Sequence, residues 1–151
     1  MQSIIEKVLW LKQVELFQRL PGEDLAQLAE VVRQVRFQAG EIILDQGEVS
    51  DRLYCVVEGE ASVRAGNQEI AKVHGGETIG ELGLFDQVPR NNTVVALSEV
   101  VTFELQEDIF FALLEDRPEI ARGIIAVMAR RLRRLNEKLL GFEAEKNLLA
   151  E

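Results

Sequence analysis

The sequence predicts a mainly β domain that carries helices at both of its ends. Eight of the eleven glycines fall between positions 40 and 83, and this density of glycine argues against long helices there. Short apolar runs recur in the same region at a spacing of about 8–12 residues, which is typical of a sandwich, a barrel or a jelly roll. Before and after this region, apolar residues recur at helical spacing. The 151 residues fit one domain, 1–151.

Residues 1–35 are predicted to be a helical N-terminal segment. Ile4, Val8 and Leu11 recur at helical spacing, and Leu20-Pro21-Gly22 then interrupts the pattern. A second helix follows, because apolar residues recur at i, i+3, i+4 and i+7. They are Leu25, Leu28, Ala29 and Val32.

Residues 36–106 are predicted to form the strands. The short apolar runs span residues 41–44, 53–57, 61–65, 68–73, 93–97 and 100–105. Gly66-Asn67 separates two of these runs, and a two-residue step of this composition is a β-hairpin signal.

Residues 107–151 are predicted to be helical again. A short helix over 109–114 precedes Arg117-Pro118, and Pro118 suits the first turn of a second helix that runs to about residue 145. Apolar residues repeat along it in alternating steps of three and four, at Ile125, Met128, Leu132, Leu135, Leu139 and Phe142. This coiled-coil pattern fits either packing on the β region or pairing with a second copy, and its length favours a homodimer.

The charge and the apolar pattern exclude several kinds of function. A formal net charge of −9 repels nucleic-acid phosphate, so this chain alone is not expected to bind DNA. No apolar run reaches the roughly 20 residues of a membrane helix, and the amphipathic first segment is unlike a signal peptide. We therefore expect a cytoplasmic protein. The arginine-rich segment 130–134 is either a solvated helix face or a positive funnel toward an anionic ligand.

The sequence offers no catalytic or metal-binding cluster. Cys55 lies in an apolar run and is expected to be a core residue, and the only histidine, His74, is expected in a turn. One cysteine and one histidine cannot form a metal cluster, which also argues against an enzyme of the cupin type. We see no nucleophile with a neighbouring base and no acid–base pair, so we expect no enzymatic activity, no metal and no cofactor.

The segment 80–93 carries the most informative chemistry. A one-turn helix that starts at Gly80 presents unpaired backbone N–H groups to an anion, and Gly83 allows a tight path. Arg90 adds a guanidinium suited to phosphate oxygens, whereas the acceptor-only Glu81 suits a sugar hydroxyl. These residues describe a nucleotide site. A Glu81–Arg90 salt bridge that ties down a surface loop is the other interpretation.

Three motifs in this order resemble the cyclic-nucleotide-binding domain family, of the type found in the catabolite activator protein and in the regulatory subunit of cAMP-dependent protein kinase. The first is Gly47-Glu48, Asp51, Leu53-Tyr54, Val56 and Gly59-Glu60. The second is Gly80-Glu81-Leu82 with Leu84, followed by Pro89-Arg90 and Thr93. It resembles the phosphate-binding cassette of the family, at residues 79–93. The third runs from Pro118-Glu119-Ile120 to Glu137-Lys138, and the similarity covers about residues 14–140.

The resemblance implies an eight-stranded antiparallel β-roll and a role for each matching residue. Glu81 would bind the ribose 2′-hydroxyl, and Arg90 would bind a phosphate oxygen together with the cassette backbone around Gly80. The backbone amides of Leu82 and Asn91 would complete the phosphate site. Pocket-lining positions near the sugar and base are Val63, Ile70 and Ala71. The long C-terminal helix would close over the base with Arg131, Leu135 and Asn136.

One departure from the family pattern concerns the two residues after the arginine. The family usually has small residues there, and this chain has Asn91-Asn92. Asparagine could bridge phosphate or a purine edge and so retune selectivity, or it could mark a silent site. The sequence therefore predicts a sensor of a cyclic nucleotide, cAMP more than cGMP. The alternative is a ligand-free fold retained for dimerisation, and in both cases the effector is a partner or a domain outside this sequence.

Overall fold

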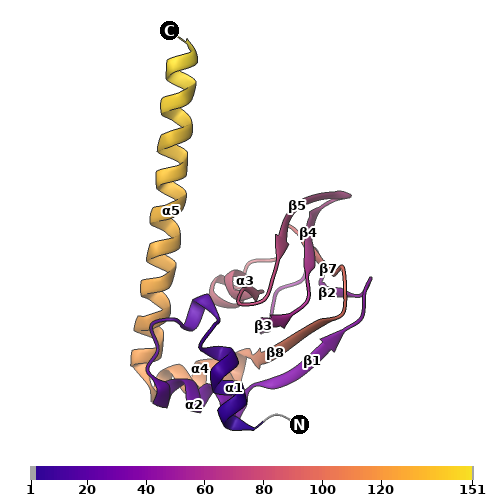
Figure 1. Ribbon diagram of the computed structural model, residues 1–151, viewed down its shortest axis with the longest axis vertical. Coiled ribbons are helices and arrows are strands. Elements are labelled where there is room, and N and C mark those ends of the chain that lie inside the picture. Colours follow the sequence, from indigo (N-terminus) through magenta and orange to yellow (C-terminus); the bar gives the residue numbers. More distant parts are fainter. Residues whose placement is uncertain (1–2, 151) are drawn as a thin grey trace.

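Two four-stranded antiparallel sheets form the centre of the protein (Figure 1). The computed structural model describes residues 3–150. One sheet has the strand order β1-β8-β3-β6 and the other has the order β2-β7-β4-β5. Every strand pairing in them is antiparallel. The predicted eight-stranded β-roll with flanking helices is confirmed.

Six of the eight strands coincide with the predicted apolar runs. The strands are β1 (Arg33–Phe37), β2 (Ile42–Leu44), β3 (Arg52–Glu58), β4 (Ala61–Ala65), β5 (Gln68–Val73), β6 (Thr78–Ile79), β7 (Thr93–Ala96) and β8 (Val100–Gln106). The pattern missed β1 and β6. The first of these begins inside the segment 1–35 that was predicted to be helical, because its pairing with β8 outweighs its weak local pattern. The second has only two residues.

Three short helices precede the sheets: α1 (Ile4–Leu11), the 3₁₀ turn η1 (Glu15–Phe17) and α2 (Gly22–Val31). Each contributes fully buried apolar side chains, among them Leu11, Phe17 and Leu28. They pack with Phe103 and Leu105 of β8 into one apolar cluster outside the β-roll. A second cluster, around Tyr54 and Val94, fills the space between the two sheets.

The chain ends in α4 (Glu107–Asp116) and the long helix α5 (Pro118–Ala150). Ile120, Ile124 and Val127 anchor the first turns of α5 in the helical core. From residue 132 to residue 150 every side chain of α5 is exposed, and Figure 1 shows this part projecting away from the sheets. Among the described residues, no helix combines the length and apolar character that crossing a membrane requires.

Candidate functional site

The segment between β6 and β7 folds around two glycines. Gly80 precedes the short helix α3 (Glu81–Asp86) and has a φ of +94°, a conformation that side-chain-bearing residues rarely adopt. A Cβ at this position would lie 2.9 Å from the carbonyl oxygen of Arg52 and 3.1 Å from Oγ of Ser50. Only glycine therefore fits between the cassette and the end of the β2–β3 loop.

A cavity of about 160 Å³ opens between the cassette and the β-roll. The roll contributes three valines, Val63, Val73 and Val94. From the cassette come Gly80, Glu81, Leu82 and Arg90. The structure thus places the predicted phosphate ligand, the predicted ribose ligand and one predicted lining residue on a single cavity.

Arg90 is held in place from its main chain and carries an unpaired side-chain donor. Its N–H donates to the carbonyl of Glu48 at 3.0 Å, and its carbonyl accepts from the N–H of Gly47 at 2.8 Å. Its side chain passes directly over Gly83, whose Cβ would lie 3.1 Å from Cδ of Arg90. Nη1 is buried and has no hydrogen-bond partner among the described residues. A cationic donor buried without an acceptor is costly. Arg90 also lines the cavity, so an anion bound there would lie beside this side chain.

Glu81 pairs with the long helix and not with Arg90. Its carboxylate, 15% exposed, accepts from Nη1 of Arg131 at 3.1 Å. Arg131 also donates through Nε to Glu15 of η1 at 2.7 Å, and Arg134 reaches the same Glu15 oxygen at 3.2 Å. The Glu81–Arg90 salt bridge considered from the sequence is therefore absent among the described residues, and the cassette is tied to α5 instead.

Arg131 and Arg134 of α5 stabilise the carboxylate of Glu15 in its charged form. The hydrogen bond from Arg131 lowers the pKa of Glu15, against the opposing effect of burial. Burial alone would lower the pKa of Arg131. The hydrogen bond to Glu15 and the charges of Glu81 and Glu15 together outweigh this effect, so the net pKa shift of Arg131 is upward. Part of the basic segment is thus used internally, so it is not simply a solvated face.

A second hollow, of about 350 Å³, lies between α5 and the cassette. Arg131 and Leu135 line it from α5, and it shares Thr78 and Glu81 with the cavity. Two of the three predicted lid residues therefore lie beside the site. The third, Asn136, is exposed on α5 and is not part of this lining.

Four other predicted site residues lie at the rim or outside the cavity. Ala71 is exposed and pairs with Val63, while Ile70 is 54% exposed at an irregularity of the β4–β5 pairing. Asn91 and Asn92 line a separate hollow, together with Leu82, Pro89 and Arg90 itself. These four stay predictions as ligand contacts.

The structure adds three residues that the sequence reasoning missed. Glu15 binds the arginines of α5, Ser50 supports the two cassette glycines, and Thr78 has a buried hydroxyl without a partner among the described residues. Ser50 lies within the first of the three motifs, so the motif already pointed to its loop. Glu15 and Thr78 carry no signal in the sequence, because their importance depends on which helix crosses over them.

The two residues considered for other chemistry have structural roles. Cys55 is fully buried, and burial raises the pKa of its thiol, which keeps it protonated and unreactive. His74 follows β5, and its Nδ1 lies 3.2 Å from Glu60. No group of three or more potential metal ligands occurs within residues 3–150.

Comparisons with known proteins agree with this geometry. Residues 34–117 match the family model described as cyclic nucleotide-binding domain. The chain is 32% identical over 134 residues to a CRP-like cAMP-activated global transcriptional regulator of Mycobacterium tuberculosis, covering 85% of this chain and 60% of that protein. It is 30% identical over 147 residues to the cyclic AMP receptor protein of Thermus thermophilus, covering 93% and 68% respectively.

A solved structure shows the same fold. The N-terminal domain of a transcriptional regulator from Streptomyces coelicolor A3(2) superposes with a TM-score of 0.74 at 35% identity. The match covers 85% of this chain and 94% of that domain. This chain spans only 60% of the length of the Mycobacterium tuberculosis regulator.

Proposed function

Because the chain belongs to the cyclic nucleotide-binding domain family, we propose that it is a regulatory sensor that binds cAMP in the cavity beside Arg90 and catalyses no reaction. The observation that carries this proposal is the buried Nη1 of Arg90, which has no acceptor among the described residues. The cyclic phosphate supplies an anionic oxygen for this donor. Glu81 and Leu82, in the first turn of α3, line the same cavity, and the N-terminal end of a helix carries positive partial charge.

Glu81 would bind the ribose and couple the ligand to α5. Its carboxylate accepts hydrogen bonds only, so it can hold the 2′-hydroxyl but not the phosphate. Arg131 already occupies one of its oxygens from α5. A ribose hydroxyl would share or replace that contact, so ligand binding favours a different position of α5. The ligand then shifts an equilibrium between two positions of the helix.

The preference for cAMP over cGMP rests on two observations. The hollow between α5 and the cassette includes the apolar side chain of Leu135, which suits adenine. Two relatives that are at least 30% identical are named for cAMP. The asparagines after Arg90 line a separate hollow and do not belong to the lining of the cavity.

Titration calorimetry on the full chain with cAMP, cGMP and 5′-AMP tests this proposal. We expect saturable binding of cAMP, weaker binding of cGMP, and little binding of 5′-AMP, whose acyclic phosphate has a different shape and charge. Tighter binding of cGMP would correct the base preference. An absence of heat with all three, with no rise in melting temperature, would instead support a ligand-free dimerisation module.

The exposed stripe of α5 suggests that the sensor acts as a homodimer. Ile125, Leu132, Leu135, Leu139 and Phe142 are each more than half exposed. Met128 alone is partly buried against the domain's own core. The stripe is therefore unpartnered along most of its length, and a second α5 would cover it. We expect a cytoplasmic setting.

Replacing Leu132 and Leu139 with glutamate should convert a dimer into a monomer in sedimentation velocity. Both side chains are exposed in the single chain, so the substitutions leave its folding intact. Leu140→Glu is the matched control, because Leu140 is equally exposed but lies off the stripe. A wild-type monomer at concentrations of about 100 μM, where weak coiled-coil pairs of micromolar Kd associate, would contradict the homodimer.

A further inference from the structure

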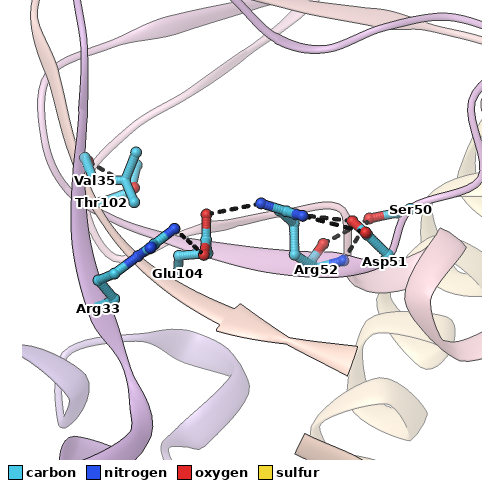
Figure 2. Close-up of polar contacts among 7 residues, drawn as sticks. All are labelled: Arg33, Val35, Ser50, Asp51, Arg52, Thr102 and Glu104. Carbon is cyan, nitrogen blue, oxygen red and sulfur yellow. Dashed lines mark hydrogen bonds and ion pairs between the residues drawn. The ribbon is translucent and has the colours of Figure 1, made fainter. Parts of the chain in front are cut away.

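A buried carboxylate links three strands behind the cassette. Glu104 of β8 is only 3% exposed, and it accepts hydrogen bonds from two arginines (Figure 2). Nη2 of Arg33, on β1, lies 2.9 Å from one oxygen. Nη1 of Arg52, on β3, lies 3.2 Å from the other. A carboxylate this deeply buried is stable only while it stays paired, so it fixes both arginines.

Arg52 continues this array into the β2–β3 loop. Its Nε and Nη2 bind the two carboxylate oxygens of Asp51 at 2.8 and 3.2 Å, a bidentate geometry that sets the direction of the turn. Its main-chain carbonyl accepts the hydroxyl of Ser50 at 2.6 Å. Figure 2 shows Ser50, Asp51 and Arg52 gathered at this end of the array. The position of Ser50 is therefore determined by its two neighbours.

Ser50 in turn lies directly beneath the cassette. It is 2% exposed, and its side chain occupies the space that a Cβ on Gly80 or Gly83 would need, at 3.1 and 3.3 Å from those Cβ positions. The side chain of Arg90 lies against Gly83 as well. A continuous stack thus runs from Arg52 through Ser50 and the glycines to the unpaired guanidinium of Arg90.

We propose that Arg52 is a positioning residue for ligand binding, which acts through Asp51 and Ser50 to hold the cassette glycines and Arg90 at the cavity. Arg52 does not line the cavity. Its side chain binds Asp51 and Glu104, and its main-chain carbonyl accepts from Ser50 and lies against Gly80. The ligand part of this inference rests on the proposed function. The positioning part concerns the backbone of the cassette and can be measured without ligand.

The test compares Arg52→Gln with Arg36→Gln. Arg36 is a matched control, because it forms an exposed ion pair with Glu99 in the same sheet and away from the cassette. Two quantities are measured: the Kd for cAMP, and hydrogen exchange of the amides of Leu84, Gln87 and Arg90, which are bonded within or across the cassette. Arg52→Gln should weaken cAMP binding by about tenfold and accelerate exchange at these amides. Arg36→Gln should change neither.

A second variant separates positioning from a loss of stability. Arg52→Gln leaves Glu104 with one partner, so stability falls, and the double variant Arg52→Gln with Glu104→Gln should recover it. Positioning predicts that the double variant regains its melting temperature but neither its cassette protection nor its affinity. If the double variant recovered its affinity for cAMP, Arg52 would have only a structural role. The same would follow if hydrogen exchange in Arg52→Gln accelerated evenly over all strands.

The two proposals fail in different ways. If the wild-type chain binds no cyclic nucleotide, the proposed function is wrong, and the exchange of the cassette amides still decides the role of Arg52. If the wild type binds cAMP while Arg52→Gln shows unchanged affinity and exchange, the positioning role is wrong and the sensor function stands.

Discussion

Replacing Arg90 with alanine is expected to weaken cAMP binding by at least about 100-fold, since each charge-assisted hydrogen bond is worth roughly 1.5–3 kcal/mol and tenfold in affinity is about 1.4 kcal/mol. The same change should leave the ligand-free domain as stable as before, or more stable. The reason is that Nη1 of Arg90 is buried without an acceptor among the described residues, so its removal relieves an unpaired donor. Calorimetry measures the affinity, and thermal melting without ligand measures the stability.

Two further variants make this result specific. Arg90→Lys retains a positive charge but loses the planar guanidinium that can bind phosphate through two hydrogen bonds, so it should bind with intermediate affinity. Arg36→Ala removes an exposed arginine of β1 that does not line the cavity, and it should bind like the wild type. Undiminished affinity in Arg90→Ala would mean that the phosphate binds elsewhere. A large fall in melting temperature would mean that the guanidinium stabilises the free domain.

The fold was accessible from the sequence wherever local pattern and long-range pairing agree. Runs such as 53–57 and 100–105 are mostly apolar, as strands buried on both faces are, and they form β3 and β8 in the structure. β1 was missed because Arg33-Gln34-Val35-Arg36-Phe37 looks unremarkable by itself. Its strand state comes from pairing with β8, about 70 positions away, and from the buried Glu104 that receives Arg33. Because β8 is so far away in the sequence, the local pattern of residues 33–37 does not indicate this pairing.

The chemistry of the residues was enough to predict which residues form the site, but not which ion pairs they make. Gly80, Glu81 and Arg90 lie together as predicted, because a glycine-delimited turn, an acceptor and a guanidinium have few other uses in one short segment. The alternative interpretation, a Glu81–Arg90 salt bridge, does not occur among the described residues. The path of α5, which the sequence could not show, brings Nη1 of Arg131 to 3.1 Å from the Glu81 carboxylate. The exposure of Ile70 depends on an irregular strand pairing, which periodicity alone cannot show.

Replacing Gly80 with alanine should damage both stability and ligand binding. A side-chain-bearing residue at a φ of +94° costs about 1–3 kcal/mol through backbone strain alone. In addition, the new Cβ would lie 2.9 Å from the carbonyl of Arg52, which is backbone and cannot easily move. The cassette would have to shift away from this carbonyl and carry Glu81 out of position. We expect a lower melting temperature and a cAMP affinity reduced by at least about tenfold, or ~1.4 kcal/mol.

The control variant Gly40→Ala separates the effect of the close contact with the Arg52 carbonyl from the effect of the strained backbone conformation. Gly40 has nearly the same φ, +90°, but a Cβ there would meet no atom within 4 Å, and it lies in the turn before β2. It should therefore lose a similar amount of stability through strain while binding cAMP normally. If Gly80→Ala bound cAMP as tightly as Gly40→Ala, the close approach between the cassette and the Arg52 carbonyl would be irrelevant to the ligand. The difference in affinity between the two variants thus measures how closely the cassette must lie on the β2–β3 loop to form the phosphate site.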